Sequence, residues 1–420
     1  PFVKDEILAT LCKKGLGVPK DAEKADELFK KAENLDIEQL SLMVKFLYEH
    51  NDWQDAEKSR KDFLNELLIQ KNPDDINAIL NLAGTEIPSH KTPEKFEKID
   101  KLYQAAIHSP KYKGENLRYI YRFYALEGRP SSDYKKAFEL VNIVSNIKDS
   151  RYRSEAMQRL ATHYLCGIGV EKDEKKGVEI LNEIMADPKL DSKSYAYVSL
   201  IWCMENGIGG LEKDQAKIDE CYSKISEDEI FGITASLRSR HSPYRLRTPI
   251  DREFSAKFLN ECAKRDIGKK RVLKLIYDYA SENERFAAEY RDIDLAWRTL
   301  LEWEKADPDD VVITLHKAHH LLAGAGVEPD AEEGLRLLKI AESKGSKLNA
   351  ALTYAYIYDK GIGVAPDKQK AAENKEKLRN TDFLRGGRTI TELSIEYGDV
   401  LPKDKEWLDN LKKELKQPAK

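Results

Sequence analysis

The sequence lacks a long apolar run. Its best candidate, residues 348–358, is interrupted by Asn349 and Thr353 and is shorter than the ~18 residues that a membrane-spanning helix requires. An excess of one charge is also missing, because 70 Lys and Arg are offset by 74 Asp and Glu, whereas a dedicated nucleic-acid binder is usually basic. We therefore expect no transmembrane segment in this chain and no nucleic-acid partner.

Cysteine is scarce, and its spacing follows no metal-binding pattern. The count is odd and no Cys-x-x-Cys occurs, which indicates neither a zinc site nor a dense disulfide framework. Cys203 and Cys221 could pair, or all five could be small apolar residues within helices. The five are Cys12, Cys166, Cys203, Cys221 and Cys262.

Signatures of catalysis and of nucleotide binding are absent as well. Gly-x-Gly occurs several times, but it is never extended to a dinucleotide fingerprint, and there is no P-loop, His-Glu-x-x-His or nucleophile elbow. His316 and His320 are four residues apart and could chelate a metal with His319 nearby, but no further ligand follows at helical spacing. We expect packed histidines, no metal, no cofactor and no enzymatic activity.

What the sequence does contain is a repeated turn. A Gly-x-Gly followed by an Asp recurs at residues 15–21, 167–173, 324–330 and 361–367, and with one extra residue at 207–214. The first Gly suits the left-handed residue that ends a helix, and the Asp suits the N-cap of the next helix. Cap residues continue in phase at a mean spacing of about 38 residues: Asp21, Asp52, Thr92, Asp133, Asp173, Asp214, Asp251, Asp292, Asp330, Asp367 and Asp404.

A small residue recurs four positions after most caps, where a helix would meet its neighbour one turn in. A small side chain there lets two helix backbones approach closely. These residues are Ala25, Ala56, Ala137, Gly177, Ser255, Ala296, Gly334 and Ala371.

Together these features predict an all-α fold, a right-handed superhelical solenoid of about ten antiparallel helix pairs with a C-terminal capping helix. No segment alternates as a strand would. Residues 1–381 would form the solenoid and residues 382–420 the capping segment. The first helices of the pairs should begin near residues 2, 36, 75, 114, 150, 191, 227, 267, 309 and 346.

The pattern around residues 160–177 and 354–371, Leu-Ala-x-x-Tyr-x-x-Gly-x-Gly-Val-x-x-Asp-x-x-Lys-Ala in outline, resembles the Sel1-like repeat, a relative of the tetratricopeptide repeat. The array is also similar to bacterial envelope polysaccharide-export scaffold lipoproteins. The resemblance implies a non-enzymatic scaffold or adaptor for one or more proteins. It implies a bacterial cell-envelope assembly, such as one for exopolysaccharide export, at a periplasmic or outer-membrane-associated location.

A row of side chains five residues before the turn glycine is a candidate partner-binding surface. In this repeat class that position tends to face the concave groove, where aromatic side chains suit protein binding. The alternative is packing between repeats. The residues are Phe123, Trp202, His319 and Tyr356.

The segment 238–252 replaces one of the turns with a longer, basic loop. It carries five arginines, with Asp251 the only acidic residue. Guanidinium groups bind carboxylates and phosphates in bidentate geometry. The alternative function is therefore binding, or hydrolysis, of an anionic polysaccharide or another acidic polymer, and the other outcome is a solvated loop paired with acidic neighbours. The predicted contacts are Arg238, Arg240, Tyr244, Arg245 and Arg247.

Overall fold

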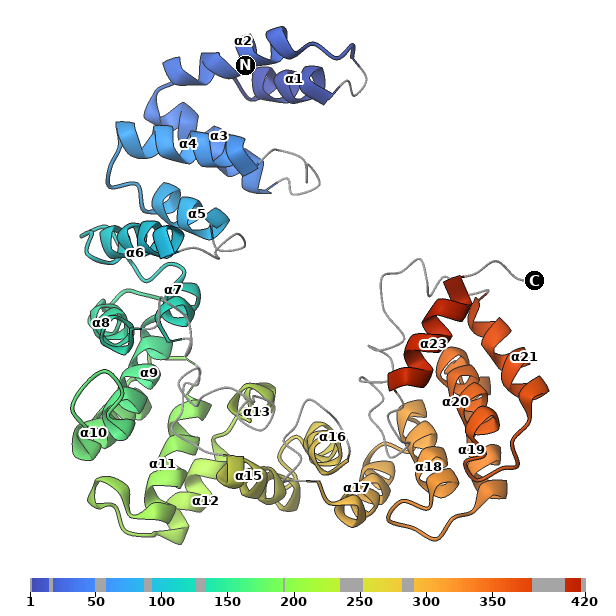
Figure 1. Ribbon diagram of the computed structural model, residues 1–420. Helices are drawn as coiled ribbons and strands as arrows, with labels where there is room; N and C mark the ends of the chain where they lie inside the picture. The colour runs from blue at the N-terminus through green and yellow to red at the C-terminus, as the bar shows by residue number, and fades with distance from the viewer. Residues whose placement is uncertain are drawn as a thin grey trace. The chain divides into compact units, whose positions relative to one another are not determined.

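The computed structural model describes residues 2–14, 18–49, 58–86, 93–125, 133–191, 193–234, 252–281, 291–379 and 405–416. Within these ranges all regular secondary structure is helical, so the predicted helical repeat solenoid is confirmed. The chain divides into two compact units, Pro1–Asp191 and Ser192–Lys420. In Figure 1 the helices of each unit follow one another in pairs.

The first unit contains five helix pairs, each made of an A helix before the turn and a B helix after it. The A helices are α1 (Phe2–Lys14), α3 (Ile37–Glu49), α5 (Ile76–Glu86), α7 (Leu117–Tyr124) and α9 (Arg153–Cys166). The B helices are α2 (Ala22–Lys30), α4 (Lys58–Lys71), α6 (Pro93–Ile107), α8 (Tyr134–Ser145) and α10 (Glu174–Ala186). A short 3-10 turn, Lys31–Asn34, extends α2.

The second unit repeats this plan and adds a final helix. Its A helices are α11 (Ser194–Asn206), α13 (Glu227–Ile233), α16 (Lys269–Ala280), α18 (Val311–Ala323) and α20 (Lys347–Lys360). Its B helices are α12 (Gln215–Ser223), α15 (Arg252–Lys264), α17 (Ile293–Ala306), α19 (Ala331–Ser343) and α21 (Lys368–Arg379), and α23 (Lys405–Lys416) follows them. Every A helix begins within about three residues of the position that the repeat spacing predicts.

Aspartate caps start the B helices as predicted. Asp173 accepts a hydrogen bond from the backbone N–H of Lys176, which satisfies one of the free donors at the start of α10. Asp52, Thr92, Asp251 and Asp404 lie outside the described residues. The same cap occurs at Asp21, Asp133, Asp214, Asp292, Asp330 and Asp367.

The turn glycines adopt the backbone conformation that the pattern predicts. Gly167 ends α9 with φ of 68°, and its N–H donates to the carbonyl of His163. Gly169, two residues later, has the same positive φ, and a Cβ there would collide with the carbonyl oxygen of Tyr134 at the start of α8. The second glycine therefore lets the turn pack directly on the preceding repeat.

The small residues four positions after the cap lie at the contact between paired helices. A Cβ on Gly177 would lie 2.6 Å from Leu165 Cγ of α9, and one on Gly334 would lie 2.8 Å from Leu322 Cγ of α18. Ala137 and Ala296 are fully buried at the equivalent positions. Close packing of the A and B helices therefore depends on the small size of these residues.

Helix α23 covers the last helix pair. Its Trp407, Leu411 and Leu415 are buried against Tyr356 and Leu378 of that pair, and Trp407 Nε1 donates to Asp359 at 2.6 Å. This is the cover that a terminal repeat needs. The predicted boundary between residues 381 and 382 lies outside the described residues.

Candidate partner-binding surface

A backbone hydrogen bond recurs within several repeats and gives a common reference point for comparing their A helices. The N–H of the cap aspartate donates to the carbonyl nine residues earlier, as from Asp133 to Tyr124 and from Asp173 to Tyr164, both at 2.9 Å. The bond recurs at Asp330 and Asp367. It therefore defines equivalent positions by counting back from each cap.

This alignment places Arg122, eleven residues before its cap, in the same row as Thr162, His319 and Tyr356. Phe123 lies one position later, in the row of the buried His163, because its sequence alignment depended on Gly128, which is outside the described residues. In α7 the residue of the predicted row is thus an arginine.

Three of the four side chains predicted to face a partner are buried. Phe123 makes edge contacts with Tyr103 and Tyr124, at ring-centroid distances of 5.2 and 5.1 Å. His319 Nε2 lies 2.9 Å from Thr353 Oγ1 of α20. Tyr356 packs on Trp407 at 4.9 Å. These three side chains therefore pack inside the protein, as the alternative to partner binding had it.

Trp202, the fourth of these side chains, is only half-buried, so it keeps surface for a partner. The predicted anion-binding residues Arg238, Arg240, Tyr244, Arg245 and Arg247 lie outside the described residues.

The histidines of α18 are buried and neutral. Desolvation lowers the pKa of His319 to about 3 and that of His320 to about 4, and it lowers the pKa of His316 as well. His320 Nδ1 lies 2.6 Å from the carbonyl oxygen of Ala325 and must donate to it, which leaves Nε2 to accept from the Tyr277 hydroxyl. No cluster of three or more potential metal ligands occurs in the described part of the chain.

A buried charged network joins α7 to α9 in the first unit. Arg118 Nε donates to both carboxylate oxygens of Glu155, at 3.1 and 2.8 Å, and Arg159 Nη2 donates to Glu155 Oε1 at 3.0 Å. The Arg159 guanidinium also stacks 4.2 Å from the Tyr121 ring centroid. Glu155 and Arg159 are both buried, whereas Arg118 extends into solvent. Sequence reasoning missed this network because Arg118 and Glu155 lie 37 residues apart along the chain.

The row that is buried in α9, α18 and α20 is open on three A helices of the first unit. Counting back eleven and fifteen residues from Asp133 gives Arg122 and Arg118 on α7. The same count along the sequence from Thr92 and Asp52, which lie outside the described residues, gives Asn81 and Asn77 on α5 and Ser41 and Ile37 on α3. We call these six residues the open row. Each of them is exposed or half-buried.

All three large hydrophobic side chains that are exposed among the described residues lie on α3 and α7. They are Ile37, Leu42 and Tyr119, with 42, 50 and 64% of their surface exposed. A groove of about 420 Å³ between α3 and α5 includes Leu42 and Val44 with Asn77, Ala78 and Asn81. The open row is therefore flanked by apolar surface that no described residue covers.

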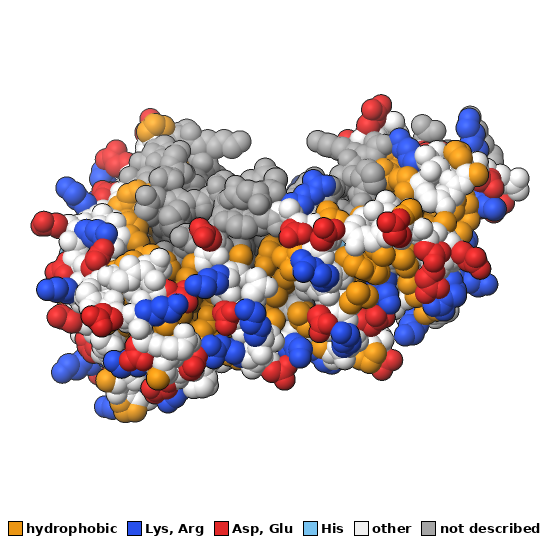
Figure 2. Space-filling view, turned by 90° about the horizontal axis from the view of Figure 1, so that it is seen from below, with side chains coloured by type: hydrophobic (Ala, Val, Ile, Leu, Met, Phe, Trp, Pro, Cys, Tyr) orange, Lys and Arg blue, Asp and Glu red, His pale blue; other side chains and the backbone are white. Residues whose placement is uncertain are grey.

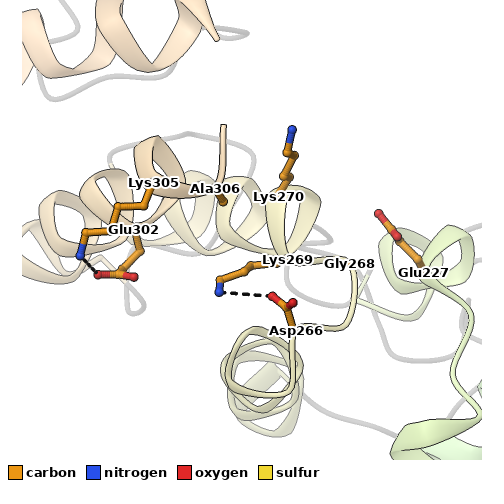
Figure 3. Close-up of a pocket in the computed structure, with 8 residues that line it drawn as sticks. All are labelled: Glu227, Asp266, Gly268, Lys269, Lys270, Glu302, Lys305 and Ala306. Carbon is orange, nitrogen blue, oxygen red and sulfur yellow. Dashed lines mark hydrogen bonds and ion pairs between the residues drawn. The ribbon is translucent and has the colours of Figure 1, made fainter. Parts of the chain in front are cut away.

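A second groove, of about 540 Å³, lies in the second unit near the start of α16. Figure 3 shows its charged lining, in which Lys269 pairs with Asp266 at 3.2 Å and Lys305 pairs with Glu302 at 2.7 Å. The hydrogen bond from Lys305 lowers the pKa of Glu302, so this carboxylate is ionised near neutral pH. Figure 2 likewise shows acidic and basic side chains interspersed over the face in view.

The helices and the cysteines also answer two questions raised by the sequence. None of the helices described is both long and apolar enough to cross a membrane. The five cysteines are thiols, with Cys166 exposed and the others buried.

Comparison with known proteins supports the repeat assignment. Five segments match the Sel1 repeat model: residues 7–36, 154–182, 192–217, 318–346 and 349–374. A comparison with curated proteins gives no match.

Among solved structures, the chain is similar to a protective antigen of uropathogenic Escherichia coli strains that displays an SLR fold. The two are 16% identical, with 100% of this chain and 88% of that chain covered and a TM-score of 0.37. It is also similar to a Sel1 repeat protein from Oxalobacter formigenes, at 17% identity, 59% and 92% coverage and a TM-score of 0.26. The five matched segments carry capped helix pairs described above, so these parts of the chain are Sel1 repeats.

Proposed function

We propose that the protein is a non-enzymatic scaffold that holds partner proteins on the A helices of its first unit. Sel1 repeats generally mediate protein–protein interactions. The observation that carries the proposal is the open row, in which amide, hydroxyl and guanidinium groups and the apolar Ile37 lie beside exposed Leu42 and Tyr119. Aromatic and Arg side chains next to apolar pockets supply much of the binding energy in protein interfaces.

We further propose that the assembly lies in a bacterial cell envelope, at a periplasmic or outer-membrane-associated site, and serves a process such as exopolysaccharide export. The support is the resemblance of the repeat array to envelope scaffolds. The near-balanced charge fits a protein partner better than a nucleic acid.

Photo-crosslinking in the source organism tests the scaffold. A photoreactive amino acid at Asn81 of the open row should give discrete crosslinked proteins, and the same group at the exposed Lys175 of α10 is the matched control. Cell fractionation of the crosslinked product reports the compartment. Equal crosslinking from both positions, or none from Asn81, would count against a scaffold that uses this surface.

A polysaccharide titration addresses the alternative function. Replacing Arg240, Arg245 and Arg247 by Ala together should leave crosslinking at Asn81 intact if the scaffold proposal is right. Tight binding of an anionic polysaccharide by the parent protein, lost in this triple variant, would favour the binding-protein alternative instead.

A further inference from the structure

The open row changes chemistry along its length. On α7 it consists of Arg118 and Arg122, with Tyr119 beside them, and α7 contains no acidic residue. On α5 it consists of two asparagines, and on α3 it reaches the groove between α3 and α5 that Leu42 helps to line. Each end therefore suits a different kind of side chain in a bound partner.

Guanidinium groups gather at the α7 end. Glu155 pairs with both Arg118 and Arg159. Arg122, one turn after Arg118, is exposed, and no described carboxylate pairs with it. A partner carboxylate placed here could accept hydrogen bonds from Arg122 in the fork geometry that guanidinium groups favour.

The middle of the row suits a peptide backbone. Asn77 and Asn81 are one helical turn apart, and each side-chain amide offers donors and an acceptor. An extended chain presents N–H and C=O groups along its length, and such groups need partners when a complex forms.

The α3–α5 groove suits an apolar side chain. Its apolar lining residues are Leu42, Val44, Leu68 and Ala78, and its polar ones are Glu38, Ser41, Lys45, Asp75, Asn77 and Asn81. Half of the Leu42 surface is exposed in the free chain, so covering it with an apolar group would be favourable.

We propose that the open row binds an extended segment of a partner protein that places an acidic residue on Arg122 of α7 and an apolar side chain in the α3–α5 groove. This proposal rests on the scaffold function proposed above. Packed helices lie about 8–10 Å apart, and at that spacing three A helices would span ~20 Å. An extended chain rises about 3.3 Å per residue, so the bound segment needs about six residues.

A displayed library of random twelve-residue peptides, selected on the full chain, provides the probe. Enriched peptides should combine Asp or Glu with Leu, Ile or Phe about four to six residues away. Fluorescence anisotropy of one enriched peptide then measures Kd. Arg122→Glu should weaken binding by about tenfold or more, Leu42→Ser should weaken it less, and added salt should weaken binding to the parent protein.

Lys175→Glu is the matched control, since it makes the same change of charge on a B helix of the same unit and should leave Kd unchanged. Circular dichroism should show all variants folded, because exposed substitutions cost little stability. Enriched peptides without acidic residues, or equal binding by Arg122→Glu and the parent, would overturn the proposal. Binding of polyuronate chains with the same Arg122 dependence, and of no peptide, would overturn it too.

The outcomes separate the two proposals. Crosslinked proteins at Asn81 together with unchanged peptide binding by Arg122→Glu would retain the scaffold and reject the acidic segment. No crosslinked protein from Asn81 and no enriched peptide would reject both.

Discussion

Helices α9 and α18 place a buried histidine at the same position but surround it with different chemistry. His163 and His320 each lie four residues before the turn glycine, contact a carbonyl oxygen of that turn and lie near a tyrosine hydroxyl of an earlier A helix. The residue one turn earlier is Arg159 in α9 and His316 in α18. Arg159 stacks on Tyr121, and His316 packs 4.6 Å from the Tyr277 ring centroid.

The difference extends to the position four residues before these. In α9 that residue is Glu155, which holds Arg159 by an ion pair, and in α18 it is Val312. The same helix geometry thus accommodates a charged network in one unit and neutral aromatic packing in the other. These two repeats therefore share the tyrosine–histidine contact but differ in the residues around it.

Lowering the pH should destabilise the second unit before the first, and this is the largest effect that we expect. Unfolded His has a pKa near 6.5, whereas burial lowers that of His320 to about 4, so the unfolded state binds more protons between these values. Stability present above pH 6.5 is lost as the pH falls towards 4, by about 3 kcal/mol for one such histidine. The second unit has three such histidines on α18, and the described part of the first unit has His163.

Hydrogen exchange measured by mass spectrometry at pH 7.5 and 5.0, with labelling times scaled for the intrinsic rate, checks this order. Peptides from α18 should lose protection at pH 5.0 before peptides from α9. Loss of protection in α9 first would contradict the role given to the histidines.

Glu155→Ala should destabilise the first unit by about 3–5 kcal/mol, because Arg159 would remain buried without its carboxylate. Urea unfolding measures the change. Glu302→Ala removes the exposed pair with Lys305 and should have little effect. The double variant Glu155→Val, Arg159→His copies the residues of α18 and should be more stable than Glu155→Ala. If the double variant is no more stable than Glu155→Ala, the residues around His320 cannot replace those around His163.

Ala137→Leu in the first unit and Ala371→Leu in the second should each cost about 1–3 kcal/mol, since both alanines are buried where paired helices meet. Thermal melts of the two variants provide the measurement. Unchanged melting temperatures in both would show that these positions tolerate added volume and that the contact is not close.

The smallest expected effect is the loss of a cap. Asp173→Ala and Asp330→Ala should each cost about 1 kcal/mol, because each removes one hydrogen bond to a free N–H at the start of a B helix. Chemical denaturation should show the same change in both units. A cost confined to one unit would mean that the caps are not equivalent.

Much of the local structure was predictable because short-range rules determine it. The caps, the left-handed glycines and the starts of the A helices depend on residues a few positions apart. The cap at Asp36 was missed, although Gln39 three residues later completes a reciprocal pair of hydrogen bonds that marks a helix start.

The candidate surface was less predictable. The register of α7 was off by one residue because the pattern was anchored on Gly128 rather than on the bond from Asp133 to Tyr124. The burial of His319 and Tyr356 depends on Thr353 and Trp407, which lie 34 and about 50 residues further along the chain. Neither contact has a local sequence signal.

The sequence by itself determined the helix pairs, their boundaries and their repeat, because caps, turns and helix-forming stretches act within a few residues. Only the tertiary structure decided on which A helices this row of side chains stays exposed. That choice depends on what packs against each helix from the neighbouring repeats. Arg122 is exposed and Tyr356 is buried at the same repeat position because α23 covers Tyr356, whereas Arg122 remains uncovered by any described helix.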